Sequence, residues 1–242
     1  MLNTENLEKF IKKYQTDREN VVREYCQHLF LSFLYQQDGS EKLLFKGGTA
    51  LRIVFRSPRF SEDLDFTGSG IRQGAVEELF TNTLAEIERT GMTVDITEGK
   101  ETTGGYLGIA TFSVYDQTNK VKIEVSLRHR RPLAGTRTVV ASDYLPPYTL
   151  VHLPKDEIIK GKMQALINRH KPRDFYDYFF LLSGDYPFVK EKENLEVVLK
   201  LLRASEINFR TELKKFLPHN HSMHLKDFKK ILEQKILEYG GK

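Results

Sequence analysis

The segment 45–66, FKGGTALRIVFRSPRFSEDLDF, constrains the fold more than any other part of the chain. A short apolar run at 43–45 leads into two glycines, which predicts a strand that ends in a turn. Thr49 can then cap a helix over residues 51–55. The run 64–66 predicts a second strand. We therefore expect a strand, a glycine turn, a short helix and an acidic strand in that order.

The acidic strand carries two aspartates one residue apart. Residues two apart in a strand point the same way, so Asp63 and Asp65 share one face while Leu64 and Phe66 face the core. Carboxylates that close repel unless a cation or a proton relieves them. Mg²⁺ is bound by one or two carboxylates together with substrate phosphates. Glu124 is the best third acid, because it lies on the polar face of an alternating strand, VKIEVSLR. We predict a metal site at these three acids.

The glycine turn suits a polyphosphate. Gly47 and Gly48 permit backbone conformations closed to other residues, and their N–H groups can cradle a triphosphate at the start of a helix. The Thr49 hydroxyl adds a further donor. Three nearby arginines can neutralise phosphate charge: Arg52, Arg56 and Arg59. We predict nucleotide binding by this turn, Thr49 and Arg52.

Ser61 lies two residues before Asp63 and is predicted to share the carboxylate face. We assign it to the nucleotide-binding set. Phosphorylation there would add close to two negative charges beside the acids. We expect Ser61→Glu to weaken NTP binding, and an unchanged NTP dissociation constant would contradict this.

The rest of the chain predicts an α+β fold. Helical spacing of apolar residues predicts two helices within 5–36, broken near Asp17, and another over 75–90. Strands are predicted over four later stretches: 93–97, 106–115, 121–128 and 136–141. From Pro154 onward the pattern is helical, and Pro146–Pro147 marks a boundary. We expect two domains, 1–150 with the sheet and 151–242 with helices only.

The 242 residues carry a net charge of +4 and a sequence pI of about 8.9, which permits nucleic-acid contact without demanding it. Basic residues cluster at 128–131 and 169–173, as solvated loops or as a phosphate-binding surface. No apolar run approaches twenty residues, and the N-terminus does not resemble a signal peptide. A single cysteine, Cys26, fits a reducing compartment. We expect a cytoplasmic protein with no membrane partner.

The order of these motifs resembles the nucleotidyltransferase superfamily with the DNA polymerase β-like fold. There, a G-[GS]-x turn and a short helix precede a D-x-[DE] pair, and a third acid follows on a later strand. This chain has Thr49 where serine is more usual and Glu124 where aspartate is commoner. The resemblance implies a mixed sheet with flanking helices, followed here by a C-terminal helical bundle.

A second motif narrows the resemblance. The segment 157–182, EIIKGKMQALINRHKPRDFYDYFFLL, resembles the C-terminal signature of the AbiEii/AbiGii (MenT-like) nucleotidyltransferase toxins. Its K-x-x-A is Lys162 with Ala165, and its R-D-x-x-D is Arg173, Asp174 and Asp177. The resemblance favours catalytic roles for Lys162 and Asp174 and nucleotide binding by Arg173. Charge complementing the helix dipole explains Asp174 equally well, and a salt bridge is the stronger explanation of both Asp177 and Arg173.

Together the motifs imply a Mg²⁺-dependent nucleotidyltransferase that is the toxin of a toxin–antitoxin pair. Asp63 and Asp65 would hold metal on the phosphates of an NTP, and Glu124 would hold a second ion. The resemblance implies RNA, such as the 3′ end of a tRNA, as acceptor and a cognate antitoxin as partner. Two alternatives stay open: a protein of the same fold that binds NTP or RNA without transfer, and a metal-dependent nuclease.

Overall fold

The computed structural model describes residues 2–114, 117–128 and 133–240, and the chain divides into two compact units. The front unit comprises Met1–Arg56 and Phe60–Pro154, and the helical unit comprises Ser57–Arg59 and Lys155–Lys242. Three residues of the segment before the acidic strand thus belong with the C-terminal helices. The expected domains, 1–150 and 151–242, stay a prediction about independent folding.

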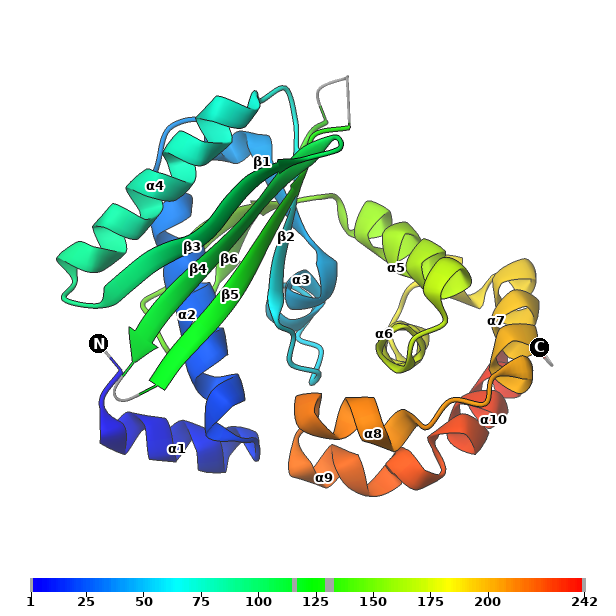
Figure 1. Cartoon of the computed structure of the whole chain (residues 1–242). Coiled ribbons are helices and arrows are strands. Elements are labelled where there is room, and N and C mark those ends of the chain that lie inside the picture. The colour runs from blue at the N-terminus through cyan, green and yellow to red at the C-terminus, as the bar shows by residue number, and fades with distance from the viewer. Residues whose placement is uncertain (1, 115–116, 129–132, 241–242) are drawn as a thin grey trace. The chain divides into compact units, whose positions relative to one another are not determined.

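A mixed seven-stranded sheet forms the centre of the front unit (Figure 1). Its strand order is β3-β4-β5-β2-β1-β7-β6. The strands, in chain order, are β1 Leu43–Lys46, β2 Asp63–Gly68, β3 Thr93–Thr102, β4 Gly105–Val114, β5 Gln117–Ser126, β6 Thr136–Val140 and β7 Tyr148–His152. β2 pairs antiparallel with β1 and parallel with β5. The acidic strand therefore lies inside the sheet, with neighbours on both sides.

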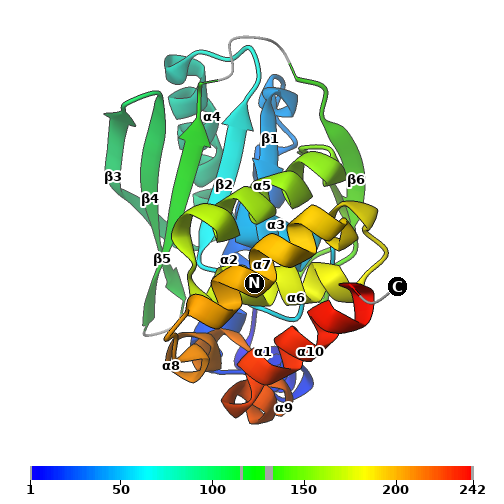
Figure 2. The same ribbon diagram turned by 90° about the vertical axis from the view of Figure 1, so that its right-hand side faces the viewer.

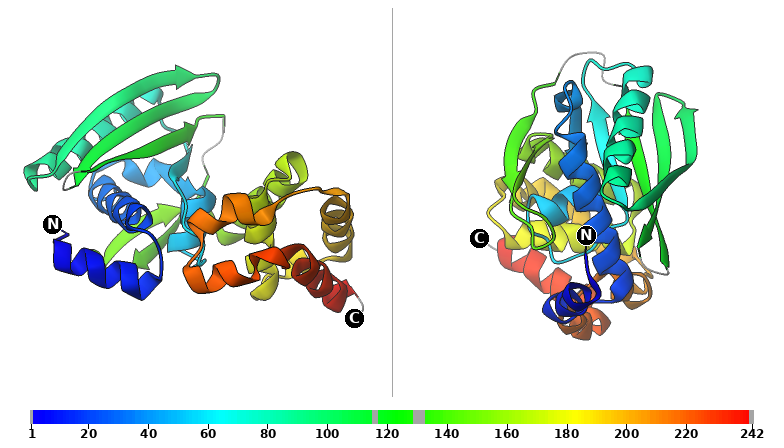
Figure 3. Two further views of the ribbon diagram at one scale, coloured as in Figure 1. Left: turned by 60° about the horizontal axis from the view of Figure 1, so that its bottom comes forward. Right: turned by 90° about the vertical axis from the view of Figure 1, so that its left-hand side faces the viewer.

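Helices cover the apolar face of this sheet. The front unit contains α1 Thr4–Tyr14, α2 Arg18–Leu34, α3 Gly47–Ile53 and α4 Gln73–Arg89, with a short 3₁₀ turn at Ser40–Lys42. α2 and α4 lie along the same face (Figure 3). Phe30 of α2, Phe66 of β2 and Phe80 of α4 are buried there with their rings in contact. Burial of such aromatic area is the main stabilising contribution to a core.

The helical unit is built from six α-helices and three short 3₁₀ turns in the part of the chain that the structure describes (Figure 2). The α-helices are α5 Lys155–Arg169, α6 Pro172–Ser183, α7 Lys192–Ala204, α8 Phe209–Leu213, α9 His219–Ser222 and α10 Phe228–Gly240. The 3₁₀ turns are Pro187–Lys190, Lys214–Phe216 and Met223–Lys226. Phe175, Phe209 and Phe228 pack ring against ring at its centre.

Two details differ from the sequence-based expectation. β7 was not predicted, because its five residues follow Pro146–Pro147 and look like the end of a domain. It nevertheless pairs parallel with β1, where Phe45 lies opposite His152, and antiparallel with β6. α3 begins at Gly47, so Thr49 lies inside the helix and does not cap it. Its hydroxyl donates instead to the carbonyl oxygen of Asp63.

The α+β class and the mixed sheet with flanking helices are confirmed. Among the described helices, none combines the length and the apolar character that a membrane crossing requires.

Candidate functional site

The glycine turn and the acidic strand touch each other. β1 leads directly into α3 at Gly47, whose φ is +85°, a left-handed conformation that favours glycine. A Cβ atom placed on Gly47 would lie 2.0 Å from Oδ2 of Asp65. Residue 47 therefore has to be glycine for two reasons, its backbone conformation and its contact with the carboxylate. This contact connects the two motifs that stand eighteen residues apart in the sequence.

The acids lie beside one another across neighbouring strands. In the parallel pairing of β2 with β5, Asp65 is opposite Glu124 and Asp63 is opposite Lys122. In the antiparallel pairing of β1 with β2, Lys46 is opposite Asp65. The structure thus brings the three predicted acids onto one face of the sheet. It adds two lysines to them, and we refer to these five residues as the carboxylate row.

The two lysines were not predicted as site residues. Lys122 forms an ion pair with Glu124, and this hydrogen bond, together with the charges of Glu124, Asp63 and Asp65, raises the pKa of Lys122 despite its partial burial. Burial lowers the pKa of Lys46, while the charges of Asp65 and Glu124 oppose that shift. The alternation of residues 121–128 already placed Lys122 and Glu124 on one face. That signal was sufficient to find Lys122.

A divalent cation fits this row only in part. No group of three histidine, cysteine, aspartate or glutamate side chains lies close enough together to hold a metal ion, among the residues that the structure describes. Two carboxylates completed by substrate phosphates are, however, a sufficient donor set for Mg²⁺. Asp63 and Asp65 fit that role. Glu124 fits it only when Lys122 releases its carboxylate.

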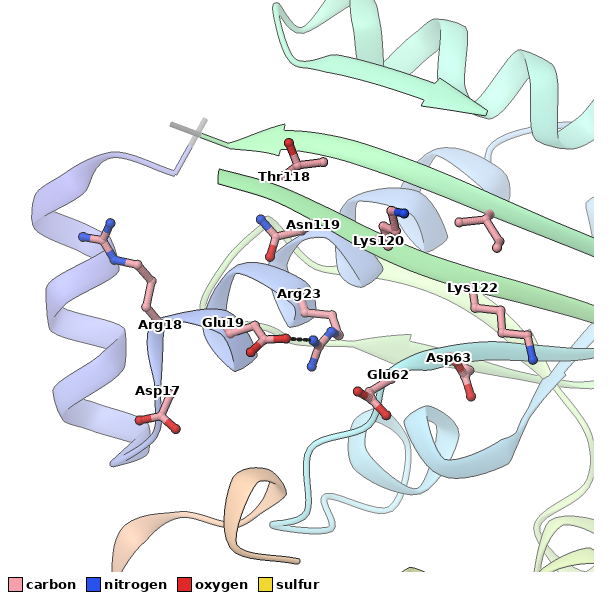
Figure 4. Close-up of a pocket in the computed structure, with 11 residues that line it drawn as sticks. Asp17, Arg18, Glu19, Arg23, Glu62, Asp63, Thr118, Asn119, Lys120 and Lys122 are labelled. Atoms are coloured by element: carbon pink, nitrogen blue, oxygen red, sulfur yellow. Dashed lines mark hydrogen bonds and ion pairs between the residues drawn. The ribbon is translucent and has the colours of Figure 1, made fainter. Parts of the chain in front are cut away.

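Two hollows adjoin the carboxylate row. The central pocket has a volume of about 360 Å³ and is lined by Lys46, Asp65, Glu124, Arg128 and the turn between β3 and β4. The strand-end pocket has a volume of about 900 Å³ and is formed by the first turn of α2, the start of β5 and Glu62–Asp63 (Figure 4). Asp63 lines one pocket and Asp65 the other. Of the predicted basic cluster at 128–131, Arg128 lines the central pocket, and residues 129–131 are outside the described residues.

Arg52 has a partner within the front unit. Its guanidinium pairs with Glu24 at 2.6 Å and lies 4.1 Å from the ring centroid of Phe60. Glu24 also accepts from the Tyr144 hydroxyl at 2.9 Å. Arg52 is not among the residues that line the central pocket. Its role in nucleotide binding stays a prediction, and in this structure it ties α3 to α2.

The remaining residues of the turn are placed by backbone contacts. Thr49 is fully buried and its hydroxyl fixes the start of β2 at Asp63. Ser61 lies just before β2, and its carbonyl oxygen accepts from the side-chain amide of Gln27 at 3.0 Å. Gly48 is in the first turn of α3. Their contacts with a nucleotide stay predictions.

A buried ion-pair cluster connects residue 59 with α5 and α6 in the helical unit. The guanidinium of Arg59 donates to both carboxylate oxygens of Asp177, at 2.7 and 2.9 Å. Lys162 donates to the same carboxylate at 2.8 Å. Burial would raise the pKa of Asp177, but the charges of Arg59 and Lys162 outweigh burial and lower it. The salt-bridge explanation of Asp177 therefore holds, with Arg59 and Lys162 as its partners.

Asp174 stabilises the beginning of α6. It accepts from the backbone N–H of Lys171 at 3.3 Å and from the Arg169 guanidinium at 2.6 Å. This is the arrangement expected of an acid in the first turn of a helix. Arg173 lies 3.4 Å from Glu212. Catalytic roles for Asp174 and Lys162, and nucleotide binding by Arg173, stay predictions.

Known structures share this fold at low sequence identity. A candidate nucleotidyltransferase from H. pylori has a TM-score of 0.56 and 16% identity, over 92% of this chain and 98% of its own. JHP933 from Helicobacter pylori has a TM-score of 0.54 and 15% identity, over 93% and 97%. MenT4, a nucleotidyltransferase toxin from Mycobacterium tuberculosis H37Rv, has a TM-score of 0.56 and 20% identity, over 92% and 84%.

Sequence comparison gives the family. Among curated proteins, none matches the chain. A family model, however, matches residues 29–238, which include both the glycine turn with its acids and the Lys162 to Asp177 motif. That model describes the AbiEii toxin, a nucleotidyl transferase of type IV toxin–antitoxin systems. The resemblance seen in the motifs is thereby confirmed: the chain belongs to the AbiEii nucleotidyltransferase toxin family and is a nucleotidyltransferase.

Proposed function

We propose that this protein transfers a nucleoside monophosphate from an NTP to a hydroxyl group of an RNA, such as the 3′ end of a tRNA, with Mg²⁺ as cofactor. The observation that carries this proposal is the carboxylate row, in which Asp65 is held between the Gly47 backbone and Glu124. A glycine turn, a helix start and clustered carboxylates are together suited to an NTP–metal complex.

The proposed reaction joins the acceptor hydroxyl to the α-phosphate of the NTP at the carboxylate row. The acceptor hydroxyl oxygen bonds to the α-phosphorus, the bond from that phosphorus to the oxygen shared with the β-phosphate breaks, and pyrophosphate leaves. A carboxylate oxygen of the row takes the hydroxyl proton. Lys46 and Arg128, which line the central pocket, bind the phosphates and stabilise the charge on the leaving group. Mg²⁺, when bound by Asp63 and Asp65, supplies charge neutralisation at the reacting phosphate.

A transfer assay tests the proposal. Purified protein is incubated with Mg²⁺, total RNA and each labelled NTP in turn, and the RNA is resolved on a gel. We expect label on RNA with at least one NTP. Absence of label on RNA with every NTP would contradict the proposed reaction.

Two variants test the site within the same assay. Asp65→Asn removes one carboxylate of the row, and we expect at least a hundredfold loss of transfer. Asp95→Asn is the matched control, because Asp95 is an exposed aspartate on β3, outside the row. Full activity of Asp65→Asn would show that the row is not the catalytic site, even if the reaction itself is observed.

The ion pair between Lys122 and Glu124 favours a second candidate function, binding of NTP or RNA without transfer. It leaves the third acid engaged by a cation of the protein. Tight NTP binding by calorimetry with no turnover on any RNA would support this alternative. The two candidates differ in turnover, which the labelled-NTP assay measures directly.

Membership of a toxin family also implies a cognate antitoxin. We expect the product of a neighbouring gene to relieve growth inhibition caused by expression of this chain. Growth that is unaffected by the chain alone would contradict a toxic role.

A further inference from the structure

We propose that the strand-end pocket binds the single-stranded 3′ end of the acceptor RNA, with the side-chain amide of Asn119 hydrogen-bonded to its terminal nucleobase. The inference rests on the proposed function and names the site of its second substrate. All residues that line the pocket belong to the front unit, so the site needs nothing from the helical unit.

Asn119 is the observation that points to a ligand. Asn119 is one of the residues that line the pocket, yet only 6% of it is exposed, because it shares the buried face of β5 with Val121. Its Nδ2 atom is buried and has no hydrogen-bond partner within the described parts of the chain. A buried donor without an acceptor destabilises the folded chain. A ligand with a carbonyl oxygen or a ring nitrogen at this position would supply the missing acceptor.

The position of the pocket assigns it to the acceptor. Asp63 and Asp65 point to the same face of β2, two residues apart. Asp65 opens onto the central pocket, where Lys46 and Arg128 suit phosphates, and Asp63 opens onto the strand-end pocket. Molecules bound in the two pockets therefore meet at the two carboxylates. Transfer requires the hydroxyl group of the RNA and the α-phosphate of the NTP to lie next to each other.

The charges of the pocket favour a chain end over a triphosphate. Its lining holds four cationic side chains and four acidic ones. Such a mixture does not concentrate positive charge, as a triphosphate requires, but it suits a nucleotide whose ribose hydroxyls and base edges also need partners. Lys120 is exposed at the rim and suits one phosphodiester, and the first turn of α2 presents the positive end of its helix dipole.

The size and the amide favour RNA over a peptide. At about 900 Å³ the pocket is at the upper end of the range for ligand sites, about 300–1,000 Å³, and has room for a nucleotide with its neighbour. Asparagine amides carry both donors and an acceptor and pair with the edges of unstacked bases. Figure 4 shows Asn119 between Thr118 and Lys120 on β5, with Glu62 and Asp63 on the opposite side of the pocket.

The binding test uses fluorescence anisotropy without NTP, so it does not depend on catalysis. The probes are four short labelled single-stranded RNAs of one sequence that differ only in their 3′ nucleotide. We expect wild-type protein to prefer one terminus. Asn119→Ala should weaken binding of that RNA about tenfold and abolish the preference. Lys120→Ala should weaken all four about equally and reduce the salt dependence.

Two controls make the result decisive. Lys100→Ala removes an exposed lysine of β3 that pairs with Glu98, outside the pocket, and should bind all four RNAs as the wild type does. Lys120 is exposed, so its variant tests the pocket even if Asn119→Ala fails to fold. Wild-type affinity and preference in folded Asn119→Ala, or in Lys120→Ala, would overturn the proposal. The proposal would also be overturned if the wild-type protein bound a hydroxyl-bearing peptide but bound none of the RNAs.

Steady-state kinetics separate this inference from the proposed function. In both pocket variants we expect a higher KM for RNA with an unchanged KM for NTP. A higher KM for NTP alone would overturn the assignment of the pocket. If the wild-type protein binds RNA through Asn119 but transfers nothing, the pocket is confirmed as an RNA site and the proposed reaction is wrong.

Discussion

Gly47 lies directly against the carboxylate of Asp65: a Cβ atom on residue 47 would be 2.0 Å from Oδ2 and 2.7 Å from Cγ. No side chain can be added at residue 47 without moving the acid. The carboxylate row is therefore positioned by backbone on one side and by Glu124 of β5 on the other. The glycine that suits phosphate binding thus has a second role, which is to fix the orientation of Asp65.

The first prediction is that Gly47→Ala inactivates the enzyme. The new methyl group displaces the Asp65 carboxylate, and the φ of +85° becomes strained, at a cost on the order of 1–3 kcal/mol. We expect at least a hundredfold loss of nucleotide transfer, measured with labelled NTP, in protein that is still folded by circular dichroism. Gly74→Ala is the matched control, because a Cβ at this position of α4 meets nothing within 4 Å. Equal activity of the two variants would contradict the role given to Gly47.

The second prediction concerns Lys122, which pairs with Glu124. Lys122→Ala frees the Glu124 carboxylate and removes a positive charge beside Asp63 and Asp65, so a divalent cation should bind more tightly. We expect the Mg²⁺ concentration for half-maximal binding to fall about tenfold, by calorimetry of the protein without NTP. Lys100→Ala removes the lysine of an exposed ion pair on β3 and should leave metal affinity unchanged.

Glu124→Gln completes this test. If Glu124 becomes a ligand once Lys122 is absent, the double variant should lose the gain in affinity that Lys122→Ala produces. A gain that persists without the Glu124 carboxylate would show that Lys122 acts on Asp63 and Asp65 only. Glu124 would then not be the third metal ligand.

The pattern of apolar and polar residues within one segment predicted the individual strands and the faces of their side chains. The alternation in residues 121–128 was sufficient for β5 and for the face of Glu124, because side chains in a strand alternate regardless of context. The pairing of Asp65 with Glu124, by contrast, depends on strand register between distant segments. The same holds for Arg59, whose partner Asp177 is 118 residues away. The spacing of residues within one segment contains no information about which residue of a distant segment will lie beside it.

Asn119 illustrates a different limit. A single asparagine in a strand has no pattern that marks it as a site, and only its burial without a partner does so. That property depends on the packing of α2 against β5.

The third prediction is that the Asp177 cluster stabilises the helical unit. Asp177→Asn removes the carboxylate that pairs with both the buried guanidinium of Arg59 and the largely buried ammonium of Lys162. Removing one partner of a buried ion pair typically costs about 3–5 kcal/mol. We expect a loss of this size in the free energy of unfolding, measured with urea. Glu157→Gln, which removes one side of an exposed pair with Lys160, should cost less than about 0.5 kcal/mol.

The cluster can also be tested by removing the charges of Arg59 and Asp177 together, which leaves the ammonium of Lys162 as the one remaining charge of the three. In the double variant Arg59→Met, Asp177→Leu, the buried charge pair is replaced by apolar side chains, so its loss of stability should be smaller than that of Asp177→Asn alone. A double variant that is less stable than the single one would show that Arg59 has a further essential partner.

The fourth prediction is a pH dependence of stability that originates at His28. This side chain is 5% exposed and its Nδ1 lies 2.7 Å from the Tyr148 hydroxyl. Burial lowers the pKa of His28 to about 4, with Arg52 acting in the same direction and Glu24 opposing it. The unfolded chain binds a proton at His28 near pH 6.5, whereas the folded chain does so only near pH 4. The stabilising contribution is therefore complete above pH 6.5 and is lost as the pH falls toward 4.

At pH 5 this loss amounts to about 2 kcal/mol relative to pH 7.5, since each pH unit between the two pKa values contributes about 1.4 kcal/mol. Urea unfolding at pH 7.5, 6 and 5 measures it. His28→Gln has no proton to bind in this range, so its stability should fall by about 2 kcal/mol less than that of the wild type. His170→Gln, at an exposed histidine, should retain the wild-type dependence. If His28→Gln and the wild type lose stability in parallel, the buried imidazole takes up its proton without opposing folding.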